Sequence, residues 1–147
     1  MQATDLKQRT RRFALEVIAF VEALPKDESS RVLSRQLLRS GTSVGANYRS
    51  AKRARSNADF IARMGIVEEE ADESDCWLEL LTESGKVSIA KSAALLKEAG
   101  ELVAIAVASI NTARGGARKA PLETRSAEDG TGGTRKAEKT SWRAVEF

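Results

Sequence analysis

Ser56–Gly85, SNADFIARMGIVEEEADESDCWLELLTESG, is the stretch that decides the fold most clearly. Ser56 followed by Asp59 resembles a capping box, in which side chains bind the free N–H groups at the start of a helix. Apolar or small residues then recur at alternating spacings of four and three, at Phe60, Met64, Val67, Ala71, Ser74, Leu78 and Leu81. Gly85 follows, in the position where a glycine commonly ends a helix. The pattern predicts one long amphipathic helix over about 57–84.

Three further segments repeat this helical spacing of apolar residues. They predict helices over about 5–24, 30–54 and 88–114. No segment shows the period-two alternation of a β-strand. The predicted fold is therefore all-α, an antiparallel up-down-up-down four-helix bundle over 1–115. The remaining residues, 116–147, are rich in glycine, serine, threonine and charge, and are expected to form a flexible, disordered tail.

Residues that start or stop helices set the expected boundaries. Pro25 is expected to end the first helix, and Ser29 or Ser30 to cap the second. The pair Gly115 and Gly116 is expected to stop the fourth helix. Such boundaries are predicted only to within two to four residues.

The second helix contains SGTSVGAN, Ser40–Asn47, which could be a glycine-rich phosphate-binding loop or a site of close helix packing. It lacks the lysine and Ser/Thr that complete a phosphate-binding loop, and it follows no strand. We interpret Gly41, Ser43, Gly45 and Ala46 instead as small residues that let two helices approach closely, at some cost in helix propensity.

Composition excludes several classes of enzyme. The chain has no histidine, so serine–histidine and cysteine–histidine catalysis and imidazole-bound zinc are impossible. Its one cysteine, Cys76, lies in an apolar run and is interpreted as a buried structural thiol. There is no apolar stretch of membrane-spanning length and no apolar signal segment near the start. We expect a non-enzymatic cytoplasmic protein with no cofactor, no metal and no membrane association.

The charges are strongly sorted along the chain, although the formal net charge is only +3. Residues 31–63 carry eight Lys/Arg against the single Asp59, while residues 64–83 carry eight Asp/Glu and no base. On a continuous second helix, four arginines fall within a stripe of about 100°, namely Arg35, Arg39, Arg49 and Arg53. Positions fourteen residues apart differ by only about 40° around the helix axis. Such a stripe can neutralise phosphates, or it can pair with the acidic run of the next helix. The residues alone leave both readings open.

If the basic surface binds nucleic acid, eight side chains are expected to do so. They are Arg11, Arg12, Arg35, Arg39, Arg49, Lys52, Arg53 and Arg55. The acidic run over 68–75 raises a different possibility, a carboxylate metal site. Di-iron bundles use Glu-x-x-His motifs, which this chain lacks, so only a carboxylate-bound magnesium is conceivable. Most of these acids are expected at the surface, with Glu70 and Glu73 hydrogen-bonding inside the bundle or at a subunit contact.

The segment from QLLRSGTSVGAN through ADFI to WLELL resembles the four-helix-bundle proteins encoded in 23S rRNA intervening sequences. The related accessory variability protein of diversity-generating retroelements shares this architecture. The resemblance covers about residues 5–114. Many relatives read ANIAE where this chain reads ANYRS, so Arg49 replaces a common alanine and Ser50 a common acid.

The resemblance implies an antiparallel four-helix bundle that assembles as a ring-like homopentamer. For the retroelement relative it also implies a basic surface that binds RNA or DNA, and a reverse transcriptase as partner. It implies no catalytic residues. The expected function is therefore an oligomeric, non-enzymatic protein that binds structured RNA or DNA, with a reverse transcriptase as a further expected partner. The alternative is a structural homo-oligomer or protein-interaction module with no affinity for nucleic acid.

Overall fold

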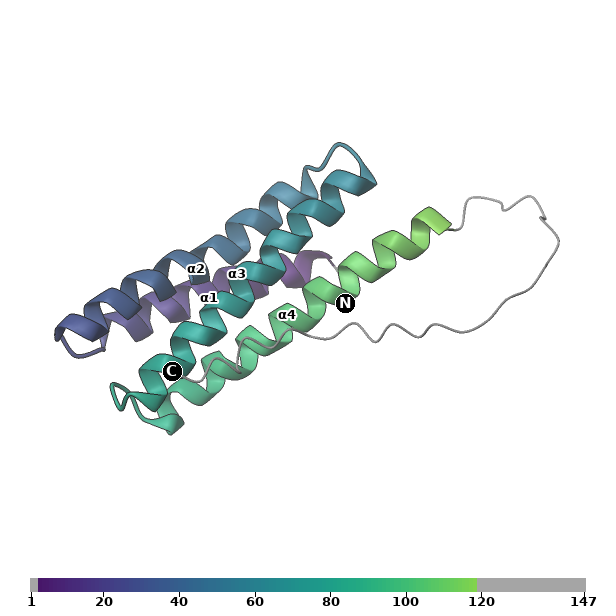
Figure 1. The fold of residues 1–147 in the computed structure, drawn as a ribbon. Helices are drawn as coiled ribbons and strands as arrows, with labels where there is room; N and C mark the ends of the chain where they lie inside the picture. The colour runs from purple at the N-terminus through teal and green to yellow at the C-terminus, as the bar shows by residue number, and fades with distance from the viewer. Residues whose placement is uncertain (1–2, 119–147) are drawn as a thin grey trace, which may run out of the picture.

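The computed structural model describes residues 3–118, which form four antiparallel helices joined by short turns (Figure 1). In chain order these are α1 (Ala3–Glu22), α2 (Glu28–Lys52), α3 (Asn57–Glu83) and α4 (Ile89–Arg118). α2 packs between α1 and α3, and α3 packs between α2 and α4. α1 and α4 also meet, but much less extensively. The predicted all-α bundle is confirmed, and the described residues contain no strand.

The fourth helix does not end where the sequence predicts. α4 continues through Gly115 and Gly116 to Arg118, so the predicted stop is wrong. A glycine costs about 1 kcal/mol relative to alanine inside a helix, but it keeps the backbone N–H that the helix needs. Two glycines therefore weaken a helix without necessarily ending it. The rest of the predicted tail, 119–147, lies outside the described residues.

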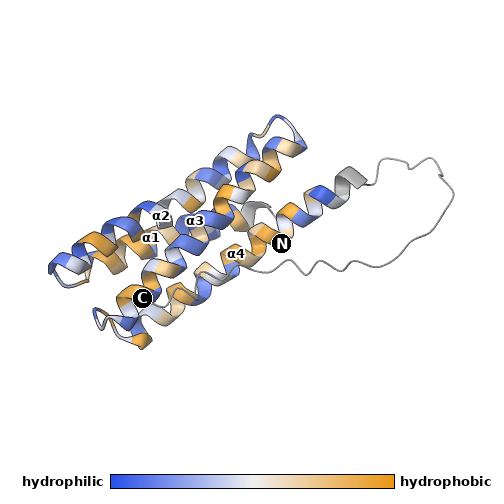
Figure 2. Ribbon diagram, viewed as in Figure 1, coloured by the Kyte–Doolittle hydropathy of each residue, from blue (hydrophilic) through white to orange (hydrophobic). Residues whose placement is uncertain are grey.

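The core consists of one buried stripe from each helix. Every helix carries both hydrophobic and hydrophilic segments along its length (Figure 2). In α3, six of the seven positions predicted to face the core are buried, and the seventh, Phe60, is partly exposed. The other helices each contribute a buried apolar stripe, and these stripes include Leu6, Phe13, Val17, Leu37, Val44, Tyr48, Leu95, Leu102 and Ile110. Each large apolar side chain that is fully buried in this way stabilises the fold by about 1.5–3 kcal/mol.

Two of the four predicted small residues, Gly41 and Gly45, bring α1 and α2 close together, whereas Ala46 is exposed and the prediction is wrong for it. A Cβ atom added to Gly41 would lie 3.0 Å from both Cγ atoms of Val17. A Cβ atom added to Gly45 would lie 3.2 Å from the Oγ1 atom of Thr10. Both distances are shorter than normal van der Waals contacts between carbon or oxygen atoms. At either position a larger residue would therefore force its neighbour on α1 to shift.

Polar residues inside the bundle are paired across helices. The buried hydroxyls of Ser40 on α2 and Ser74 on α3 lie 2.9 Å apart. Each also lies within hydrogen-bonding distance of a carbonyl oxygen in its own helix. The hydroxyl of Thr82 on α3 lies 2.9 Å from that of Ser92 on α4. Because a buried hydroxyl without a partner is costly, these pairs favour one alignment of the helices.

The helix ends use local hydrogen bonds, one of which differs from the prediction. Asp27, rather than Ser29 or Ser30, is the N-cap of α2, and its carboxylate accepts the backbone N–H of Ser30. An aspartate is favoured there because its negative charge also complements the positive end of the helix. The predicted cap of α3 is confirmed, since the Ser56 hydroxyl accepts the N–H of Asp59. Gly85 has a φ of +77°, as expected of a glycine that follows a helix.

Asp27 also joins the two loops at one end of the bundle. Its Oδ1 lies 3.1 Å from the Nζ of Lys86, in the turn between α3 and α4. The N–H of Ser30, the Ser30 hydroxyl and the Lys86 ammonium hold the pKa of the Asp27 carboxyl well below its usual range. The ionised carboxylate is therefore the form that the folded chain favours.

Replacing Gly41 tests the close packing of α1 on α2. Gly41→Ala should lower the free energy of unfolding by about 1 kcal/mol, because overpacking against the buried Val17 outweighs the gain in helix propensity. Gly65→Ala on α3 is the matched control, since its new Cβ would meet no atom within 4 Å. The control should gain up to about 1 kcal/mol. Urea denaturation measures both, and an equal gain in both variants would show that the helices are not in close contact at Gly41.

Lowering the pH should weaken the cap of α2. A carboxyl whose pKa is depressed in the folded state stabilises the fold above its unfolded pKa near 4, and this contribution is lost as the pH falls towards the folded pKa. Asp27→Asn keeps a capping oxygen but does not titrate. The melting temperature of the natural chain should exceed that of Asp27→Asn at pH 6, and the gap should close as the pH falls below about 4. A gap that is constant with pH would contradict this role of the charge.

Candidate nucleic-acid interface

The arginine stripe predicted on the second helix lies on one continuous helix. α2 runs through both glycines without a break, and Arg53 is its C-cap residue. Arg35 and Arg53 are eighteen residues apart, which corresponds to about 27 Å along the axis. Both side chains are exposed, as are those of Arg39 and Arg49. The arginines nevertheless differ in their surroundings.

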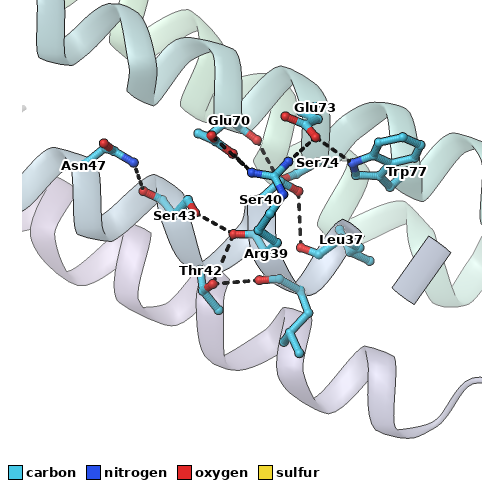
Figure 3. Close-up of polar contacts among 11 residues, drawn as sticks. Leu37, Arg39, Ser40, Thr42, Ser43, Asn47, Glu70, Glu73, Ser74 and Trp77 are labelled. Carbon is cyan, nitrogen blue, oxygen red and sulfur yellow. Dashed lines mark hydrogen bonds and ion pairs between the residues drawn. The ribbon is translucent and has the colours of Figure 1, made fainter. Parts of the chain in front are cut away.

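Arg39 is paired with the acidic run of α3 (Figure 3). Its guanidinium donates to Glu73 and, at 3.2 Å, to Oε2 of Glu70. The hydrogen bond to Glu73 and the charges of both carboxylates raise the pKa of Arg39. Glu73 also accepts the indole N–H of Trp77 at 3.3 Å. Glu70 and Glu73 do form hydrogen bonds, but those to Arg39 lie on the exposed side of the α2–α3 contact rather than inside the bundle, and Arg39 carries little uncompensated charge.

A second paired arginine, Arg9, connects α1 to α4. Arg9 donates two hydrogen bonds of 2.9 Å to Glu98 and one of 2.6 Å to Glu101. The hydrogen bond to Glu98 is the main cause of the raised pKa of Arg9. These residues line a groove of about 520 Å³ between the two helices, together with Gln8, Arg12, Phe13, Glu16 and Ala94. Arg12 therefore lies on the α4 side of α1, and α4 makes no contact with α2 within the described chain.

Five exposed cations lie at the end of the bundle where α2 and α4 end. We call this surface the basic end, and it consists of Arg49, Lys52, Arg53, Arg55 and Arg114. The Asn57 side chain donates to the carbonyl of Ala113 at 2.8 Å, which holds the end of α4 beside the turn between α2 and α3. The ammonium of Lys52 lies 5.9 Å from the centre of the Tyr48 ring. Among the side chains that the structure describes, residues 6–115, none forms an ion pair with any of the five cations.

The acid nearest to this surface in the sequence, Asp59, is already engaged. Its Oδ1 accepts from the Arg63 guanidinium at 2.9 Å, and its Oδ2 accepts the backbone N–H of Arg55. Helix C-termini carry a partial negative charge of about half a unit, which basic residues in the last turn offset. Five cations exceed what two helix ends require. The basic end therefore has a net positive charge.

Four of the eight predicted site residues meet in the basic end, namely Arg49, Lys52, Arg53 and Arg55. Arg39 is paired and Arg12 lines the α1–α4 groove. Arg11 and Arg35 are exposed elsewhere, with Arg35 about 21 Å from Arg49 along α2. Sequence reasoning missed Arg114. An antiparallel bundle places the end of the fourth helix beside the turn between the second and third, and that topology was the available signal.

Outside the basic end, the acidic side chains and the one cysteine are the remaining candidates for a chemical role among the described residues. The described residues contain no group of three or more Cys, Asp or Glu side chains placed to hold a metal ion. Cys76 is half-buried, and this burial, with nearby carboxylates, raises the pKa of its thiol and so disfavours the reactive thiolate. Among the helices of the described chain, none has the length and hydropathy needed to span a bilayer.

Comparison with known proteins places the chain in a family. The model of the 23S rRNA-intervening sequence protein family matches residues 2–108. The chain belongs to this family. It is also similar to a crystal structure of a protein of unknown function from the S23 ribosomal protein family of Bacteroides thetaiotaomicron VPI-5482. The two are 32% identical with a TM-score of 0.70, over 76% of this chain and 99% of that one. No curated protein matches the chain.

Proposed function

We propose that this member of the 23S rRNA-intervening sequence proteins is a non-enzymatic, self-associating bundle that binds structured RNA or DNA through its basic end. The observation that carries this is the group of five exposed cations without ion pairs in the described chain. They lie at the ends of two helices and in the adjoining turn. Phosphate groups that approach such a surface displace condensed counterions, which is the main source of sequence-independent affinity.

Several features bear on the class of ligand. Among the described residues, Tyr48 and Phe13 are buried, and Phe20, Phe60 and Trp77 pack against the core. Single-stranded nucleic acids are usually held by exposed aromatic rings that stack on bases. The basic end offers charge without such rings, which favours a base-paired ligand held by its phosphates. The family name makes a hairpin from a 23S rRNA intervening sequence the first ligand to test.

The non-enzymatic part of the proposal rests on the amino acids available. The chain has no histidine, and the thiol of its one cysteine has a raised pKa. A reverse transcriptase is a further partner to test, on the strength of the resemblance to the retroelement accessory protein alone.

A second candidate function is a protein-interaction module without affinity for nucleic acid. It is favoured by the pairing of Arg39 with Glu70 and Glu73, and of Arg9 with Glu98 and Glu101. These pairs show that part of the basic surface serves to hold neighbouring helices together. They do not involve the basic end, which is why we favour nucleic-acid binding.

Salt dependence tests the first candidate. If five cations neutralise five phosphates, the affinity for duplex RNA or DNA should fall with a log–log slope of about −4.5 against salt concentration. The double variant Arg49→Gln/Arg53→Gln should weaken binding and flatten the slope by about two units. Fluorescence anisotropy from 50 to 200 mM salt measures both quantities.

Arg39→Gln is the matched control for that experiment, because it removes an arginine of the same helix that is already paired. It should leave the slope nearly unchanged. An equal effect of Arg39→Gln and Arg49→Gln would show that net charge, rather than the basic end, attracts the ligand. Absence of binding at 50 mM salt would favour the interaction module.

The exposed face of α4 is the surface through which we propose that copies associate. Twelve consecutive residues, 102–113, carry no charge, although 31% of the chain is charged. Ala104, Val107 and Ala108 are exposed on this segment. Small apolar side chains let another helix approach closely and bury area that water otherwise covers.

Self-association can be measured by sedimentation equilibrium. The natural chain should have a mass that is a multiple of 15.9 kDa, and the resemblance implies a fivefold multiple. Val107→Glu should shift the mass towards the monomer, because it places a charge in the proposed contact. Leu15→Glu, at a residue 57% exposed on α1, is the control and should leave the mass unchanged. A natural chain that is monomeric at micromolar concentration would refute self-association.

A further inference from the structure

Beside the basic end, one shallow hollow is lined by several hydrogen-bond donors. It lies on the surface of α2, has a volume of about 240 Å³, and is lined by Ala46, Arg49, Ser50 and Arg53. These positions are spaced by three, one and three residues, so all four share one face of the helix. Ala46 is exposed and ends in a methyl group, which leaves space between the longer side chains.

The two arginines are free to bind a ligand in this hollow. Their Cβ atoms are one turn apart, about 5–6 Å, so both guanidinium groups can reach one group placed between them. Neither forms an ion pair with another side chain of residues 6–115. A guanidinium matches the oxygen spacing of a phosphate and can donate two parallel hydrogen bonds to it.

Ser50 provides a third donor, and its hydroxyl differs from those of other serines and threonines in α2. Ser34, Thr42 and Ser43 each donate to a carbonyl oxygen three or four residues earlier. The Ser50 hydroxyl has no hydrogen-bond partner within the described chain. A helical hydroxyl that is not bonded back to its own helix is available to a ligand.

We infer that Arg49, Ser50 and Arg53 form a seat for one phosphate group, with Ala46 providing the room that the group occupies. Free phosphate and the phosphodiester of a nucleic acid share this chemistry. The proposed function makes a nucleic acid the molecule that carries this phosphate. The inference rests on the proposed function only for the identity of that molecule. The positive charge of this last turn also offsets the negative end of α2, but that effect requires no hollow and no hydroxyl.

Ala46→Leu tests the seat without changing any charge. Leucine is a good helix former, so the variant should fold, while its side chain fills the hollow. Affinity for a duplex RNA should fall about tenfold, the value of one hydrogen bond to a charged group, and Ser50→Ala should cause a similar loss. Ala19→Leu, at an exposed position of α1 near the other end of the bundle, is the matched control and should bind like the natural chain.

A second measurement identifies the source of the phosphate. In ¹H–¹⁵N spectra, inorganic phosphate should shift the backbone amide signals of residues 46–53 in the natural chain, relative to chloride at the same ionic strength. The shifts should be absent in Ala46→Leu. Phosphate shifts without any RNA binding would support the seat with a free phosphate as ligand, and would refute the proposed function.

Two results would overturn the seat itself. The first is RNA binding that Arg49→Gln weakens but that Ala46→Leu and Ser50→Ala leave unchanged, since charge alone would then explain the affinity. The second is the absence of both phosphate shifts and RNA binding.

Discussion

The close contact between α1 and α2 is the constraint on which the rest of the structure depends. The missing side chains of Gly41 and Gly45 let Val17 and Thr10 lie directly against the α2 backbone. Neighbouring Ser40 faces the other way and meets Ser74 of α3. α2 is therefore held on two sides by small residues whose contacts tolerate little rotation. Its outer face, with Ala46, Arg49, Ser50 and Arg53, is fixed as a consequence.

Ion pairs divide the arginines into two groups with different roles. Arg39 and Arg9 each bridge two carboxylates of a neighbouring helix, α3 and α4 respectively. The exposed pairs of Arg39 contribute at most about 1 kcal/mol each, so they align helices more than they stabilise them. The cations of the basic end face no such carboxylates within residues 6–115. Their charge is available for binding because Asp59 is paired with Arg63, and the acidic run of α3 over 68–75 lies farther along the bundle.

Much of the fold could be predicted from the sequence because the relevant signals are local. The spacing of Met64, Val67, Leu78 and Leu81 determines which face of α3 is buried, whatever it packs against. The close approach at Gly41 was predictable for a similar reason, since glycine inside a helix costs stability unless space requires it. The end of α4 and the cap of α2 were predicted wrongly, because alternatives there differ by only about 1 kcal/mol.

The sequence by itself determined the helices, their buried faces and the exclusion of histidine chemistry, because spacing and composition are properties of the chain alone. Only the tertiary structure decided which charges remain free. Arg39 and Arg49 are both exposed arginines of one helix, and nothing local distinguishes them. Packing places Glu70 and Glu73 opposite the first, and brings Arg114 of α4 to the end of the bundle where the second lies. Electrostatic interactions depend on distance in space, which the sequence does not state.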